Sequence, residues 1–119
     1  MSKSSFDEAS AGARCRHQNA LTDAHAAFRK AVAESDRERY ARYLATEAAW
    51  NEVKSDANHP EHDKRSSAFN RAKEPADHGP AREALARAIA GADSALHVEL
   101  RQIGAEHGVL TGTPPVARG

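Results

Sequence analysis

Residues 13–59 read ARCRHQNALTDAHAAFRKAVAESDRERYARYLATEAAWNEVKSDANH, a stretch of 47 residues without glycine or proline. Glycine and proline are the residues that most often interrupt regular structure, and most residues of this stretch favour helix. The stretch therefore predicts long helices and an all-α fold. We expect a three- or four-helix bundle with two long helices, a short crossover helix and flexible termini.

Two segments of the stretch show separate helical patterns. Over residues 16–34, one helix face carries Leu21, His25, Phe28 and Val32. The motif Ser35-Asp36-Arg37-Glu38 has the spacing of an N-terminal capping box, which predicts a second helix from there to about Ala57. We favour a break or kink at this motif, and the alternative is one continuous helix over 16–57. The buried side of the second helix is expected to hold Tyr40, Tyr43, Leu44, Trp50 and Val53.

Two further helices are predicted after this stretch. A short helix over 60–73 has Phe69 as its main apolar anchor. The last helix, over 80–107, is expected to end at Gly104 or Gly108. It has the most regular apolar face in the chain, formed by Leu85, Ile89, Ala92, Leu96, Leu100 and Ile103.

These patterns divide the chain into three parts. We expect residues 1–15 to be a mobile N-terminal arm, residues 16–108 to be the helical bundle domain, and residues 109–119 to be a C-terminal tail. The N-terminal residues lack the apolar segment of a signal peptide, and no apolar run approaches the ~20 residues needed to span a bilayer. These features predict a cytoplasmic protein without a membrane partner.

The composition predicts a thin hydrophobic core. The chain has 26 Ala but only 16 Leu, Ile, Val and Phe residues together, and Ala buries little apolar area. We therefore expect a second copy of the chain or another protein to supply further burial. Lys and Arg number 17, as do Asp and Glu, and this neutral balance disfavours a dedicated nucleic-acid binder.

The sequence contains no catalytic signature that we recognise. It lacks the Gly-x-Ser-x-Gly elbow, the phosphate-binding loop and the dinucleotide fingerprint. Its single cysteine, Cys15, excludes an intramolecular disulfide and a cysteine-based zinc cluster. We therefore predict a non-catalytic protein without a cofactor, which acts through protein–protein contacts as an assembly, adaptor or regulatory subunit.

One carboxylate falls on a predicted apolar face and marks a candidate ligand site. Glu47 lies at helical spacing from Tyr40, Tyr43 and Trp50, and a buried carboxylate is costly unless it is paired. One hypothesis is an aromatic pocket that binds a cation or an amine. The favoured interpretation is that Glu47 pairs with an arginine or a tyrosine hydroxyl at the edge of the core.

The seven histidines suggest a divalent-metal site as an alternative. The candidate ligands are His59, His62 and His78, near several carboxylates, although their spacing matches no established metal motif. Capping and loop positions explain these residues equally well, and we favour that interpretation. His25 and His107 lie on predicted apolar faces, where a pH-sensitive pair is the hypothesis and ordinary core positions are the favoured alternative.

Basic residues between positions 37 and 73 suggest a second alternative, a DNA-associated regulator. Acidic residues alternate with these cations, and such mixed charge is typical of a solvated helix face, so we disfavour this function. The candidate nucleic-acid contacts are Arg37, Arg39, Arg42, Lys64, Arg65 and Arg71.

Overall fold

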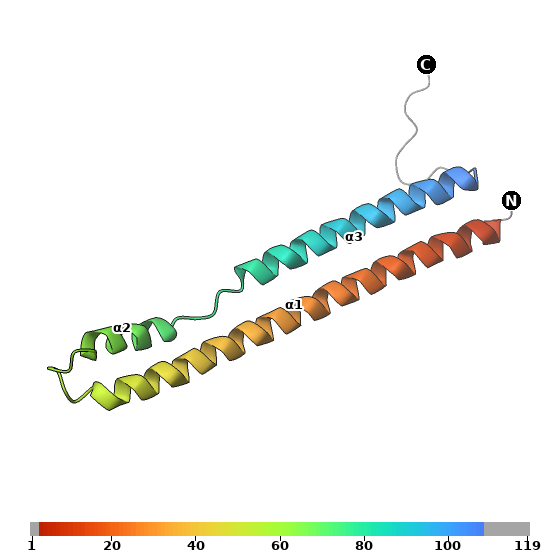
Figure 1. Ribbon diagram of the computed structural model, residues 1–119. Coiled ribbons are helices and arrows are strands. Elements are labelled where there is room, and N and C mark those ends of the chain that lie inside the picture. Colours follow the sequence, from red (N-terminus) through yellow and green to blue (C-terminus); the bar gives the residue numbers. More distant parts are fainter. Residues whose placement is uncertain (1–2, 109–119) are drawn as a thin grey trace, which may run out of the picture. The chain divides into compact units, whose positions relative to one another are not determined.

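A computed structural model describes residues 3–108 and shows three helices (Figure 1). Helix α1 spans Lys3–Val53, α2 spans His62–Ala72 and α3 spans Gly79–Glu106. Within the described range there is no strand. The all-α prediction is confirmed, with two long helices and a short one between them. The predicted tail, 109–119, lies outside the described residues.

Helix α1 is a single helix of 51 residues, so the favoured break near Ser35 is wrong. The charged side chains of Asp36, Arg37 and Glu38 are exposed to solvent. Solvent-exposed charged side chains do not oppose helix formation. A capping motif need not begin a new helix when the residues before it are also helical. The interruption of the apolar pattern therefore leaves the backbone continuous.

The predicted N-terminal arm also differs from the structure, because residues 3–15 form the first turns of α1. Gly12 lies within these turns and costs the helix only about 1 kcal/mol relative to Ala. Tertiary contacts offset this cost. Ala13 is 1% exposed, and the ring of Phe6 packs against that of His107.

The chain forms two compact units, which we describe separately. The terminal unit contains residues 3–28 and 82–108, and the central unit contains residues 29–81, as far as these ranges are described. In the terminal unit, the first half of α1 packs along α3. The two helix segments are antiparallel, since Arg16 pairs with Glu99 and His17 pairs with Asp93.

The apolar face predicted for the last helix is confirmed in the terminal unit. All six of its residues are partly or fully buried, namely Leu85, Ile89, Ala92, Leu96, Leu100 and Ile103. Helix α3 ends before Gly108, which adopts a positive φ of 66°. The His107 amide donates to the Ile103 carbonyl at 3.0 Å, and glycine accepts the left-handed conformation that follows without a Cβ penalty.

In the central unit, the second half of α1 packs against α2 through aromatic rings. Tyr43 and Phe69 have ring centroids 5.5 Å apart, which confirms Phe69 as the anchor of the short helix. Trp50 meets His62 edge to face at 4.9 Å. Val53 is 2% exposed and is the only buried apolar side chain in the described part of this unit.

Two residues predicted on the buried side of α1 are exposed instead. Tyr40 is 58% exposed and Leu44 is 45% exposed. Helix α2 covers the α1 face that carries Tyr43 and Trp50, and neighbouring residues of a helix point about 100° apart. Leu44 therefore points away from α2, and a helix only 11 residues long covers too narrow a stripe to shield Tyr40 as well.

Helix α1 also ends earlier than predicted, at Val53 rather than near Ala57. The chain turns here because Asp56 offers a local alternative to the helix. Its amide donates to the Val53 carbonyl at 2.9 Å, while its carboxylate accepts the Asn58 amide at 3.1 Å. Short polar side chains commonly stabilise such turns at the expense of helix.

Burial is sparse throughout the described residues. Four apolar side chains are buried in them, and two of these are Ala, namely Ala13 and Ala24. Each unit is built on a pair of helices, and two helices bury only the seam between them. None of the three helices is both long enough and apolar enough to cross a lipid bilayer.

Candidate functional site

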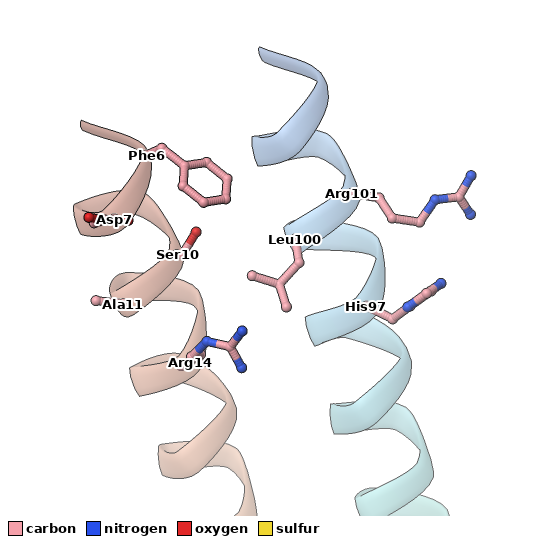
Figure 2. Close-up of a pocket in the computed structure, with 8 residues that line it drawn as sticks. All are labelled: Phe6, Asp7, Ser10, Ala11, Arg14, His97, Leu100 and Arg101. Carbon is pink, nitrogen blue, oxygen red and sulfur yellow. The ribbon is translucent and has the colours of Figure 1, made fainter. Parts of the chain in front are cut away.

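The terminal unit has a groove between the start of α1 and the end of α3 (Figure 2). Its volume is about 560 Å³, within the range of binding sites in proteins. We call it the Phe6 groove, and it is lined by Phe6, Asp7, Ser10, Ala11, Arg14, His97, Leu100 and Arg101.

The interior of the Phe6 groove is apolar. The side chains of Phe6 and Leu100 point toward each other between the two helices (Figure 2), and both are half-buried. The His107 ring lies edge-on to Phe6, with centroids 5.9 Å apart. This aromatic contact holds the Phe6 ring in place at the groove.

Positive charge dominates the border of the Phe6 groove. Two arginines, Arg14 and Arg101, line it, against one carboxylate, Asp7. Within residues 5–108, no side-chain hydrogen bond or ion pair engages Arg14 or Arg101, whereas the neighbouring Arg16 pairs with Glu99. The two guanidinium groups are therefore available to an anionic group brought to the groove.

Two buried polar atoms near Phe6 have no hydrogen-bond partner in the described structure, the Ser10 hydroxyl and Nδ1 of His107. An unpaired buried polar atom costs about 1–3 kcal/mol. Ser10 lies one turn after Phe6 on α1, and His107 is the ring partner of Phe6. This end of the terminal unit therefore has more unpaired buried polar atoms than the rest of the α1–α3 interface described in this unit.

A second, smaller hollow lies on α3 beside the Phe6 groove. It has a volume of about 280 Å³ and is lined by Val98, Arg101, Gln102 and Ala105. We call it the Val98 hollow, and Val98 itself is 53% exposed. Arg101 borders both depressions, so the residue forms a cationic ridge between two apolar surfaces.

The predicted aromatic pocket around Glu47 is not assembled as one site. Tyr43 packs on Phe69 and Trp50 packs on His62, while Tyr40 points to solvent. Glu47 is half-buried and lies near the Tyr43 hydroxyl. Repulsion by the Glu47 carboxylate, followed by desolvation, raises the pKa of Tyr43. The favoured interpretation, in which Glu47 pairs with an arginine or a tyrosine hydroxyl, stays a prediction.

A hollow lies between α1 and α2, but none of the residues of the predicted aromatic pocket around Glu47 lines it. It has a volume of about 370 Å³ and is lined by Arg42, Ala45, Thr46, Ala68, Arg71 and Ala72. Thr46 donates its hydroxyl to the Arg42 carbonyl of its own helix at 2.7 Å. This hollow therefore presents small apolar side chains between two arginines.

The three predicted metal ligands are not brought together, and no cluster of three or more candidate ligands exists among the described residues. His78 contacts Asp36 at 2.8 Å and so ties the segment before α3 to α1. His62 packs on Trp50, and Nδ1 of His59 accepts the Glu61 amide at 3.0 Å. Each of these histidines therefore has a separate local contact.

Two of the six predicted nucleic-acid contacts are engaged within the central unit. Arg39 donates to the carbonyls of Lys73 and Glu74 just after α2. Arg65 donates to the Ala49 carbonyl at 3.0 Å and to Glu52 at 2.8 Å. Hydrogen bonds to Glu52 and then Glu61 raise the pKa of Arg65. The other four cations are exposed, namely Arg37, Arg42, Lys64 and Arg71.

The Phe6 groove was missed at the level of sequence because half of it lies in the predicted arm. A signal was nevertheless present. Phe6, Ser10, Ala13 and His17 follow steps of four, three and four residues, which continue directly to Leu21. Extending the apolar face backwards through Gly12 would have predicted a longer helix with Phe6 on its packed side.

Comparison with known proteins found no match to any family model, to any curated protein or to any solved structure.

Proposed function

We propose that this protein is a non-catalytic helical subunit that acts through protein–protein contacts, in assembly, as an adaptor or in regulation. The observation that carries the proposal is the sparse burial in both units. Four apolar side chains are buried among the described residues, while Tyr40, Leu44 and Val98 are about half exposed or more.

The physical argument concerns the source of stability. Apolar burial contributes about 25 cal/mol per Å², and ordering each residue costs on the order of 1–2 kcal/mol of backbone entropy. A pair of Ala-rich helices buries one narrow seam, so additional burial against another protein would stabilise it strongly. Exposed apolar side chains beside shallow hollows are typical of surfaces that bind other proteins.

Native mass spectrometry of the untagged protein, purified without chelator, tests this proposal. It reports the number of subunits and any bound protein, metal or small molecule in one measurement. Thermal unfolding over a dilution series should accompany it, since self-association makes the unfolding temperature depend on concentration. An oligomer, or a complex with a second protein, supports the proposal. A monomer with a bound metal or small molecule, whose unfolding temperature is independent of concentration, contradicts it.

A further inference from the structure

We propose that the end of α3, with the first turns of α1, binds an amphipathic helix of a partner protein that carries an acidic residue within its apolar face. This inference rests on the proposed function and specifies the surface and the chemistry of the partner. It concerns the Phe6 groove, the Val98 hollow and the Arg101 ridge between them.

The shape of the surface favours a helix over a small molecule. Small-molecule sites enclose most of their ligand. Here the two hollows are open and share Arg101 of α3. Figure 2 shows His97 and Arg101 projecting from α3 while Leu100 points toward α1. An amphipathic helix presents side chains at i, i+3 or i+4, and i+7 along one face. Its outer two side chains would fill the two hollows, and its central side chain would lie over Arg101.

The charges specify the central side chain. Arg14 and Arg101 are exposed, and their side chains have no ion pair or hydrogen bond within residues 5–108. The basic side chains further along the same seam already have acidic partners, Arg16 with Glu99 and His17 with Asp93. A glutamate or aspartate of the partner at the central position would therefore meet the free guanidinium group of Arg101, which borders both hollows, while Arg14 adds positive charge on the α1 side of the groove. Guanidinium–carboxylate contacts are strong and directional, particularly when apolar contacts on both sides exclude water.

A second copy of this chain fits the surface less well. The exposed apolar pair on α1 is Tyr40 and Leu44. Arg37 lies three residues before Tyr40, and Arg42 lies two residues before Leu44. Both arginines are exposed and would approach the cationic ridge. Juxtaposed like charges oppose association.

The test is a titration of the full chain with an Ala-based helical probe peptide, followed by amide chemical shifts. The peptide is about 16 residues long, a length at which such helices become stable. It carries Leu at two positions separated by two turns and Glu between them. We expect shift changes in residues 5–14 and 97–105 and none in 36–53. The double variant R14Q/R101Q should bind about tenfold more weakly.

Two matched controls sharpen the result. The double variant R29Q/R87Q removes the same charge from exposed positions outside both hollows and should bind the peptide as the wild type does. A peptide with Lys in place of Glu should bind about tenfold more weakly than the acidic peptide. Circular dichroism of both protein variants verifies that their helix content is unchanged.

Several results would overturn the inference. Equal binding of the Glu and Lys peptides would do so, as would shift changes that map to the central unit. Binding of a fatty acid, dodecanoate, at the groove without binding of the peptide would point to a small-molecule site instead. Concentration-dependent shifts of the same residues without peptide would show that a second copy occupies the surface instead. If native mass spectrometry finds an oligomer or a complex but the peptide does not bind, this inference fails and the proposed function stands.

Discussion

The ring of Phe6, near the start of α1, lies edge-on to the ring of His107, which follows the end of α3, with centroids 5.9 Å apart. This contact joins residues that are 101 positions apart and brings the two ends of the described chain together in the terminal unit. It also fixes one wall of the Phe6 groove.

Replacing Phe6 by Ala should destabilise the terminal unit by about 2 kcal/mol, because a half-buried ring loses part of its apolar burial and an aromatic pair. Amide hydrogen exchange should accelerate in residues 5–28 and 82–106. The variant Leu44→Ala provides the control, since Leu44 is 45% exposed and its truncation should change stability by less than about 0.5 kcal/mol. Equal effects of the two substitutions would show that Phe6 is not packed as described.

The raised pKa of Tyr43 predicts a specific response to the substitution Glu47→Gln. Removing the carboxylate removes the main cause of the shift, so the pKa of Tyr43 should fall toward the ordinary value of 10.0. Tyrosinate absorbance during an alkaline titration measures this, with Tyr40→Phe used to isolate the Tyr43 signal. An unchanged titration would contradict the proximity of Glu47 to Tyr43.

The same shift has a consequence for stability. A group whose pKa is raised on folding holds its proton more tightly in the folded state, so its contribution is complete below the unfolded value. For Tyr43 that contribution should decline as the pH rises above about 10 through the folded pKa. The Glu47→Gln protein should lose stability less steeply over this range, as measured by chemical denaturation at a series of alkaline pH values.

Arg65 should hold α2 against α1 because its planar guanidinium group donates several hydrogen bonds at once. It donates to Ala49, Glu52 and Glu61, and lysine cannot reproduce this fork. We expect Arg65→Lys to accelerate amide exchange in α2 about threefold, the effect of losing one hydrogen bond of ordinary net strength. Lys64→Arg, at an exposed neighbouring position, should leave exchange unchanged. Full protection in the Arg65→Lys protein would indicate that charge alone is sufficient.

Two glycines should respond in opposite directions to alanine. Gly91 lies within α3, and an added Cβ would meet no atom within 4 Å, so Gly91→Ala should stabilise the protein by about 1 kcal/mol. Gly108 has a φ of +66°, and Gly108→Ala should cost about 1 kcal/mol. Thermal unfolding of both variants gives the comparison, and destabilisation by Gly91→Ala would contradict an open position.

The local pattern was sufficient to predict some features of this protein. Most residues from 13 to 53 favour helix. The regular spacing of apolar residues from Leu85 to Ile103 indicates which face of the last helix is packed. The anchor of the short helix, Phe69, was also predictable, because it is the only large apolar side chain in that segment. These features depend on backbone propensity and on residues within a few turns of one another.

The Phe6 groove was not predictable in the same way. The groove forms only where residues 6–14 and residues 97–101 meet across the terminal unit. Gly12 and the polar composition of the first residues led to the prediction of an arm for the part of α1 that lines it. Glu47 shows the converse case. Its spacing suggested a pocket, but α2 engages Tyr43 and Trp50 separately and leaves Tyr40 in solvent.

The sequence by itself determined three features: the helical secondary structure, the face of α3 that is packed, and the small apolar area that the chain can bury. These follow from helix propensity, apolar periodicity and composition, which can be read from the sequence without knowledge of tertiary contacts. Only the tertiary structure decided that α1 continues through Ser35, that Arg39 and Arg65 are engaged while Arg14 and Arg101 are free, and that two hollows border one arginine. The reason is physical: pairing of a charge and exposure of an apolar side chain depend on what lies opposite, and spacing along a single helix carries no information about its neighbour.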